Sequence, residues 1–123
     1  MKKVLSMVCA VAICLGMAGC RPVDVDKNTY KLGKEAISII DDYLDFEIEK
    51  DEAKEKMDKI SDAMRRLSQR DIDKKYIDNV RIVDGYVGMS GTYIISIKLN
   101  KEKELLKYRN ILADILNEPQ RKE

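Results

Sequence analysis

The sequence predicts a mainly α-helical fold, a small bundle that begins with a helical hairpin. Apolar residues recur at spacings of three and four in residues 29–69 and again near the C-terminus, as in helices that bury one face. Acidic residues begin the second arm of the hairpin and basic residues end it, which suits the helix dipole. Residues 78–99 also fit a β-hairpin. An α+β domain with a helical hairpin, this β-hairpin and a C-terminal helix is therefore the alternative.

The hairpin has two arms joined by an acidic turn. The first arm carries one apolar stripe, and the second carries a seam that steps by four and three, the a/d pattern of packed helices. Asp51 is the expected N-cap of the second arm, and Arg65, Arg66 and Arg70 lie at its far end. The stripe comprises Ala36, Ile37, Ile40, Tyr43 and Leu44, and the seam comprises Ala53, Met57, Ile60, Met64 and Leu67.

The C-terminal segment predicts one more helix. Asn100 can cap its start, and Pro119, which cannot continue a helix, lies just beyond its end. Residues 119–123 are then a frayed polar tail. The apolar face of this helix comprises Leu105, Tyr108, Ile111, Leu112, Ile115 and Leu116.

Residues 71–99 fit two structures. Their many β-branched residues favour strands, and Gly85, Gly88 and Gly91 would each cost a helix about 1 kcal/mol. A helix is also possible, because seven positions recur at spacings of four and three and only one of them is polar. Asp84 could cap a helix that runs to about residue 98. The stepped positions are Tyr76, Val80, Val83, Val87, Ser90, Ile94 and Ile97.

The first 19 residues have the order of an export signal. Lys2 and Lys3 form a basic start, and Val4–Gly16 is apolar apart from one serine. This stretch is shorter than the roughly 20 residues that a membrane-spanning helix needs. Removal of the segment after export is therefore the better interpretation.

The residues that end this segment resemble the lipobox of bacterial lipoproteins. Ala18, Gly19 and Cys20 match the lipobox, and Met17 stands where leucine is commonest. The resemblance implies cleavage between Gly19 and Cys20 and a diacylglycerol on the Cys20 sulfur. That lipid would hold the protein on the extracytoplasmic face of the cell membrane. An ordinary secretory signal that contains Cys20 is the alternative.

The layout of the remaining chain resembles small uncharacterised lipoproteins of Gram-positive gut bacteria. The resemblance covers the hairpin, the stretch that follows it, and Tyr108–Ala113 with the sequence Tyr-Arg-Asn-Ile-Leu-Ala. It implies a protein that is helical throughout, and it therefore favours the bundle over the α+β alternative. It implies no activity.

These segments divide the chain into four parts. Residues 1–19 are the signal, 20–28 the lipidated N-terminus and a short tether, 29–118 one small helical domain, and 119–123 the polar tail. Without the two lysines of the signal, 21 basic residues remain against 22 acidic ones, a formal charge of −1. This near-neutrality argues against a nucleic-acid partner, which would select clustered positive charge.

The chain after residue 20 contains no histidine and no cysteine. Those residue types supply the usual general base near neutral pH, the thiol nucleophile and most zinc ligands. The sequence therefore predicts no catalytic residue, no metal site and no cofactor. Asp24–Glu35 matches part of a calcium-binding EF-hand loop, but Thr29 replaces the glycine of the sharp turn and no helix precedes the loop.

Carboxylates crowd the turn of the hairpin and support an alternative function, a carboxylate-based cell-wall enzyme or an accessory of one. Such an enzyme needs two carboxylates that face each other across a cleft. A solvated turn followed by a helix start explains the same residues more simply. They are Asp41, Asp42, Asp45, Glu47, Glu49, Asp51 and Glu52.

The preferred function is a non-enzymatic interaction module that is anchored to the membrane and binds a protein or another envelope component. Tyrosine is favoured at interfaces because it offers apolar area together with one hydroxyl. Tyr86, Met89 and Tyr93 are therefore the candidate binding face, and packing of the same residues in the core is the alternative. A small-ligand carrier is the least favoured function, because a domain of about a hundred residues hardly encloses a ligand pocket.

Overall fold

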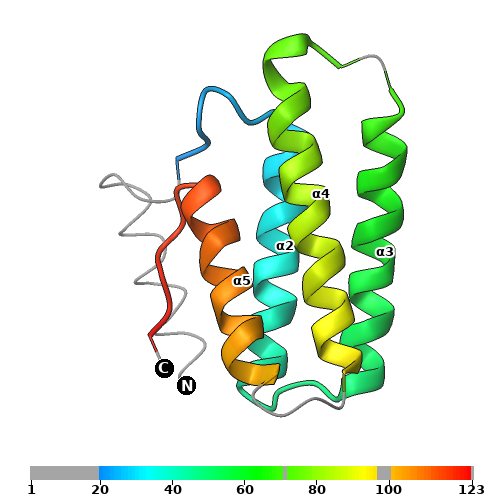
Figure 1. The fold of residues 1–123 in the computed structure, drawn as a ribbon, viewed down its shortest axis with the longest axis vertical. Coiled ribbons are helices and arrows are strands. Elements are labelled where there is room, and N and C mark those ends of the chain that lie inside the picture. The colour runs from blue at the N-terminus through cyan, green and yellow to red at the C-terminus, as the bar shows by residue number, and fades with distance from the viewer. Residues whose placement is uncertain (1–19, 71, 97–100, 123) are drawn as a thin grey trace.

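Residues 20–70, 72–96 and 101–122 are described by the computed structural model, and they form a bundle of four helices (Figure 1). No strand occurs in these residues. The predicted mainly α bundle with an N-terminal helical hairpin is therefore confirmed. The helices are α2 (Lys27–Leu44), α3 (Lys50–Ser68), α4 (Lys74–Ile95) and α5 (Lys101–Ile115).

The helices alternate in direction, so that each lies antiparallel to the one before it (Figure 1). Both α2 and α4 pack against α3 and α5, and α2 also touches α4 across the bundle. Within the described residues α3 and α5 make no contact. The face formed by α2 and α3 and the face formed by α4 and α5 therefore lie on opposite sides of the bundle.

The core is built from the apolar stripes that the sequence pattern predicts. The entire second-arm seam is buried in α3. Tyr43 and Leu44, at the end of the first-arm stripe, are only half-buried and pack against the core from its margin. The other helices bury Ala36, Ile37 and Ile40 from α2, Val80, Val83, Val87 and Ile94 from α4, and Leu105, Leu112 and Ala113 from α5.

The ambiguous stretch forms the long helix α4. It begins at Lys74, after Asp73, whereas Asp84, the expected cap, lies in the middle of the helix. The alternative of a β-hairpin at 78–99 is wrong up to residue 95, and its last residues lie outside the described part of the chain. Packing explains this outcome, because the four-three step buries one side of α4 and that burial outweighs β-branched propensity.

Small residues let α3 and α4 approach each other closely. Ser90, the polar member of the α4 step, is fully buried. Its hydroxyl has no hydrogen-bond partner among the described residues, so its small volume explains its place better than its polarity does. Next to it, a Cβ at Gly91 would lie 3.9 Å from the Cβ of Met57 on α3.

The start of α2 is set by a side-chain cap. The Asp26 carboxylate accepts hydrogen bonds from the backbone N–H groups of Asn28, at 3.1 Å, and Thr29, at 3.2 Å. The helix therefore begins at Lys27, two residues before the predicted domain boundary. Most of the partial EF-hand pattern lies in this helix, so these residues do not form a calcium loop.

The starts of the other helices differ less from expectation. α3 begins at Lys50 and follows Glu49, so Asp51 lies in the first turn rather than at the N-cap. Its acidic side chain still meets the positive end of the helix dipole there. Asn100, the expected cap of the last helix, lies outside the described residues.

Gly33 permits the close contact between α2 and α5. A Cβ at this position would lie 2.5 Å from Leu116 Cδ1 and 3.5 Å from Val83 Cγ1. By contrast, a Cβ at Gly85 or Gly88 on α4 would meet nothing within 4 Å. Gly33 is thus required by packing, whereas Gly85 and Gly88 contribute no close approach inside the bundle.

We expect opposite effects on stability when these glycines are replaced. Gly85→Ala and Gly88→Ala should each raise the free energy of unfolding by about 0.5–1 kcal/mol, because alanine favours an exposed helix. Gly33→Leu should lower it by about 1–3 kcal/mol, because the side chain overpacks the contact with Leu116. Urea unfolding of residues 20–123, followed by circular dichroism, measures both changes. A destabilised Gly85→Ala variant would contradict the open surface described for α4.

Candidate functional site

Cys20, the predicted attachment residue, is exposed and lies a few residues before the core. The Arg21 guanidinium donates to the carbonyl oxygen of Val25 at 3.1 Å, and the Val25 side chain is only 1% exposed. The side-chain amide of Asn79 on α4 donates to the carbonyl oxygen of Asp24 at 2.9 Å. The predicted tether at 20–28 is therefore too long, because the chain is packed against the bundle from residue 25 onward.

Gly19, the other residue of the predicted cleavage site, lies outside the described residues. None of the helices among the described residues is both long and apolar enough to span a membrane. Cys20 is thus the part of the predicted attachment site that the structure describes.

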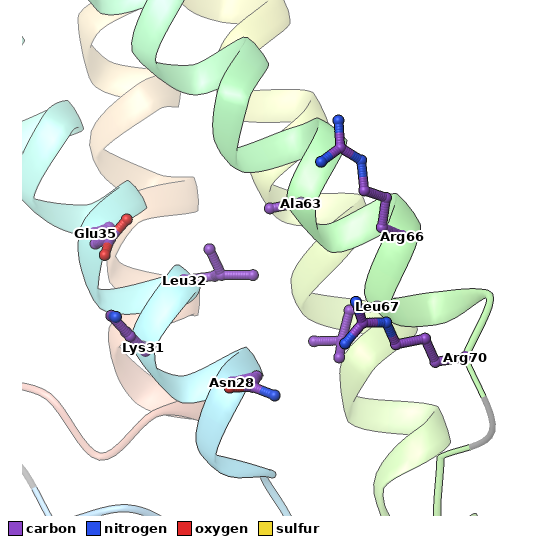
Figure 2. Close-up of a pocket in the computed structure, with 8 residues that line it drawn as sticks. All are labelled: Asn28, Lys31, Leu32, Glu35, Ala63, Arg66, Leu67 and Arg70. Carbon is purple, nitrogen blue, oxygen red and sulfur yellow. The ribbon is translucent and has the colours of Figure 1, made fainter.

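A groove lies between the first half of α2 and the end of α3 (Figure 2). Its volume is about 350 Å3. Leu32 extends into it from α2, and the Arg70 side chain extends back towards α2 from the residues that follow α3 (Figure 2). The apolar lining comprises Leu32, Ala63 and Leu67, and the polar lining comprises Asn28, Lys31, Glu35, Arg66 and Arg70.

The structure brings Tyr86 and Tyr93, two of the predicted binding residues, against a third tyrosine. The ring of Tyr108 on α5 lies 5.8 Å from that of Tyr86 and 5.2 Å from that of Tyr93, between ring centroids, in tilted arrangements. A hydrogen bond with Tyr93 and partial burial raise the pKa of the Tyr108 hydroxyl above its ordinary value. The two α4 tyrosines are half-buried, so they contribute both to packing and to the surface.

Met89, the third predicted residue, lies between these tyrosines on α4 and is 42% exposed. Ile82, one turn before Tyr86, is 44% exposed. Ile82, Tyr86, Met89 and Tyr93 step by four, three and four, so α4 carries a second apolar seam besides the one in the core. We call these four residues the outer seam. No charged residue occurs in α4 after Asp84.

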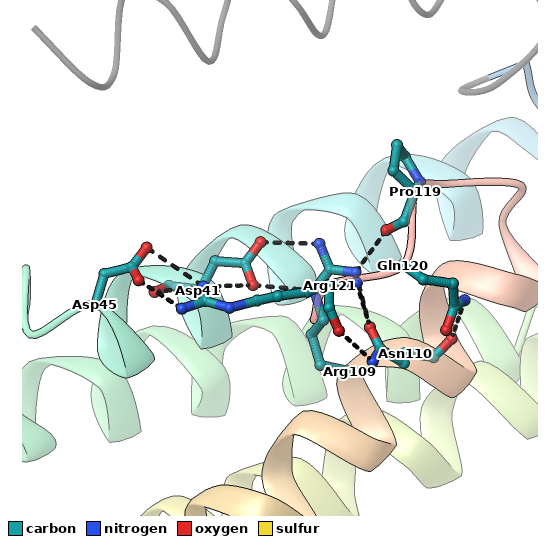
Figure 3. A network of polar contacts seen from close by, with 7 residues as sticks. All are labelled: Asp41, Asp45, Arg109, Asn110, Pro119, Gln120 and Arg121. Carbon is teal, nitrogen blue, oxygen red and sulfur yellow. Dashed lines mark hydrogen bonds and ion pairs between the residues drawn. The ribbon is translucent and has the colours of Figure 1, made fainter. Parts of the chain in front are cut away.

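The acidic turn is tied to α5 by a nearly buried arginine (Figure 3). Arg109, 8% exposed, donates from Nε and Nη2 to the two carboxylate oxygens of Asp41, at 2.9 and 3.0 Å. Its Nη1 donates to the carbonyl oxygen of Pro119 at 2.7 Å and to the side-chain oxygen of Asn110 at 3.2 Å. Four acceptors thus hold one guanidinium in a fixed orientation.

The residues after α5 join the same network, so the predicted frayed tail is wrong for residues 119–121. Arg121 donates to the carboxylates of Asp41 and Asp45, and the hydrogen bond to Asp45 raises the pKa of the Arg121 guanidinium. Its backbone N–H and C=O pair with the side-chain amide of Asn110, each at 2.8 Å (Figure 3). Two carboxylates of the acidic turn therefore have arginine partners that hold the fold together.

Sequence reasoning missed part of this arrangement. Ile82 and Tyr108 extend the predicted binding face, and their spacing and aromatic character were visible in the sequence. The partners of Asp41 could not be found in this way, because Arg109 lies 68 residues away along the chain. Among the described residues, no group of three or more potential ligands could hold a metal ion.

Comparison with protein-family models, curated proteins and solved structures gave no match to this chain. Three local features of the molecule therefore bear on its function. These features are the exposed Cys20, the groove between α2 and α3, and the outer seam of α4.

We expect Asp41→Asn to lower the free energy of unfolding by about 2 kcal/mol, because it leaves the Arg109 guanidinium nearly buried without its counter-charge. Asp58→Asn is the matched control. It removes an exposed ion pair with Lys54, 3.1 Å long, and should cost less than about 0.5 kcal/mol. Urea unfolding at neutral pH measures both variants. Equal losses would show that the Arg109–Asp41 pair contributes no more than a surface pair.

Proposed function

We propose that this protein is a lipid-anchored interaction module on the extracytoplasmic face of the cell membrane, without enzymatic activity of its own. In this proposal the signal is cleaved before Cys20, and a diacylglycerol on Cys20 anchors the chain. Two acyl chains suffice for stable membrane attachment, whereas one does not. The bundle then binds a protein or another envelope component through the outer seam of α4.

The attachment is supported by the sequence around Cys20 and by its exposure. Lys27, the start of α2, lies seven positions after Cys20, so the segment comprises seven residue steps. Fully extended, they span at most about 25 Å. The anchored bundle would therefore stay next to the membrane.

The outer seam is the observation that carries the binding function. Its residues have the a/d spacing of a helix that pairs with another helix, yet no helix of the bundle covers Ile82 or Met89. The tyrosines at its edge have hydroxyl groups that can bond across an interface. Gly85 and Gly88 contribute no packing inside the bundle. Because they have no side chains, the backbone of a partner could approach α4 closely beside the outer seam.

The carboxylate-based enzyme has weaker support. Asp41 and Asp45, two of its candidate residues, form ion pairs with Arg109 and Arg121. A general acid or nucleophile needs access to its substrate. The interaction module is therefore the function that we propose.

We expect Cys20→Ser to move the protein out of the membrane fraction or to leave it unprocessed, because the lipid can no longer be attached. Fractionation of cells that express the full chain, with the apparent mass read from immunoblots, tests this. Ser6→Ala, a change within the signal, is the control and should leave localisation unchanged. A processed Cys20→Ser protein that remained in the membrane fraction would rule out anchoring through this residue.

We expect a photo-crosslinking residue at position 89 to give a reproducible adduct in intact cells, because Met89 lies in the middle of the outer seam. The same crosslinker in place of Lys56, which is exposed on α3, is the matched control and should not give that adduct. Ile82→Glu should abolish the adduct from position 89, because a charge two turns away on the same face disrupts the apolar contact. Identical adducts from both positions would show that the outer seam has no preference for a partner.

A further inference from the structure

The cations of the groove between α2 and α3 differ from the other basic residues of α3. From Lys54 to Arg65, every basic side chain of α3 forms an ion pair with an acid three or four positions away. Among the described residues no ion pair is formed by Arg66, Arg70 or Lys31, which all line the groove. Among the described residues of the lining, Glu35 is the one acid beside three basic residues, so this lining has an excess of positive charge.

The lining of the groove suits a ligand that is both anionic and apolar. Arg66 and Arg70 are exposed, whereas Leu67 between them is buried and Leu32 is half-buried. The charged groups therefore surround the apolar ones. Guanidinium groups bind phosphate oxygens through several N–H donors, and the apolar residues can contact hydrocarbon next to the phosphate.

The position of the groove indicates the source of such a ligand. It lies at the end of the bundle where α2 begins and α3 ends, and the segment 20–26 enters α2 at this same end (Figure 1). The acidic turn between α2 and α3 lies at the opposite end. A bundle attached through Cys20 would thus present its unpaired cations towards the membrane and its acidic turn away from it.

We propose that the groove binds the phosphate-bearing headgroup of an anionic phospholipid. Arg66, Arg70 and Lys31 contact the phosphate oxygens, and Leu32 and Leu67 contact the glycerol and the first methylenes of the acyl chains. The proposal depends on the proposed attachment through Cys20 for the orientation of the bundle. The charge and the shape of the groove do not depend on that attachment.

Vesicle binding by a chain without the lipid tests the groove separately. The helices, the core and the groove all lie within residues 20–122, so a chain of residues 20–123 contains the whole bundle. This chain carries Cys20→Ser, and its co-sedimentation is measured with vesicles of phosphatidylcholine alone and of phosphatidylcholine with phosphatidylglycerol. We expect binding to the anionic vesicles and little binding to the neutral ones.

The double variant Arg66→Gln/Arg70→Gln should weaken binding to the anionic vesicles by roughly 25-fold, at about fivefold for each basic residue near an anionic surface. Lys54→Gln/Lys56→Gln is the matched control on the same helix. It removes the same charge outside the groove and should change binding less than about twofold. Circular dichroism during urea unfolding verifies that both double variants remain folded.

Three results would overturn the groove as a lipid site. Equal losses in the two double variants would assign binding to overall charge, and equal binding to neutral vesicles would assign it to apolar contact alone. If inorganic phosphate, added in a titration, bound as tightly as the anionic vesicles, the groove would be a site for a free anion. If the vesicle experiment fails, attachment through Cys20 is unaffected, because this chain carries no lipid. If the fractionation experiment fails, the attachment is ruled out, but the vesicle experiment still tests the groove.

Discussion

The ion pair between Arg109 and Asp41 is the interaction on which the placement of α5 depends. A guanidinium that is 8% exposed must have its donors satisfied, and here its acceptors come from α2, from α5 itself and from the residues after α5. Gly33 allows α2 and α5 to approach closely enough for this pairing. Because successive helical residues point about 100° apart, turning Arg109 towards α2 directs Tyr108 towards the tyrosines of α4. One buried charge therefore also positions the aromatic edge of the outer seam.

The helices could be predicted because each buries one side, and the spacing of apolar residues reports that directly. The seam of α3 is buried as its four-three step predicts, and the same step in α4 proved more informative than its β-branched residues and glycines. Helix starts were less predictable, because Asp51 and Asp84 are chemically good caps that the packed helices do not use. The docked tail and the Arg109–Asp41 pair could not be predicted, because they join residues far apart in the sequence that no local pattern connects.

For the candidate sites, the sequence likewise shows which residue types are present but not where the fold places them. A formal charge near zero describes the whole chain but not its ends, since cations that form no ion pair within the described residues lie beside the groove and acids gather at the opposite turn. Charge counts could therefore exclude a strongly basic protein, but they could not reveal a local excess. Likewise, the helical spacing of Tyr86 and Tyr93 with Met89 was visible in the sequence, but only the packing of α4 against α5 shows that Tyr108 lies against both tyrosines.

If the chain is anchored through Cys20, as we propose, the short segment between Cys20 and the buried Val25 would also limit how the molecule searches for a partner. A long flexible linker would let a binding domain explore a deep volume above the membrane, and its effective concentration near any one target would be low. With so few residues ahead of the core, a lipidated molecule would diffuse laterally within a thin layer at the bilayer surface. Encounters would then be two-dimensional, and even a modest affinity of the outer seam would give high occupancy on targets that share the same membrane.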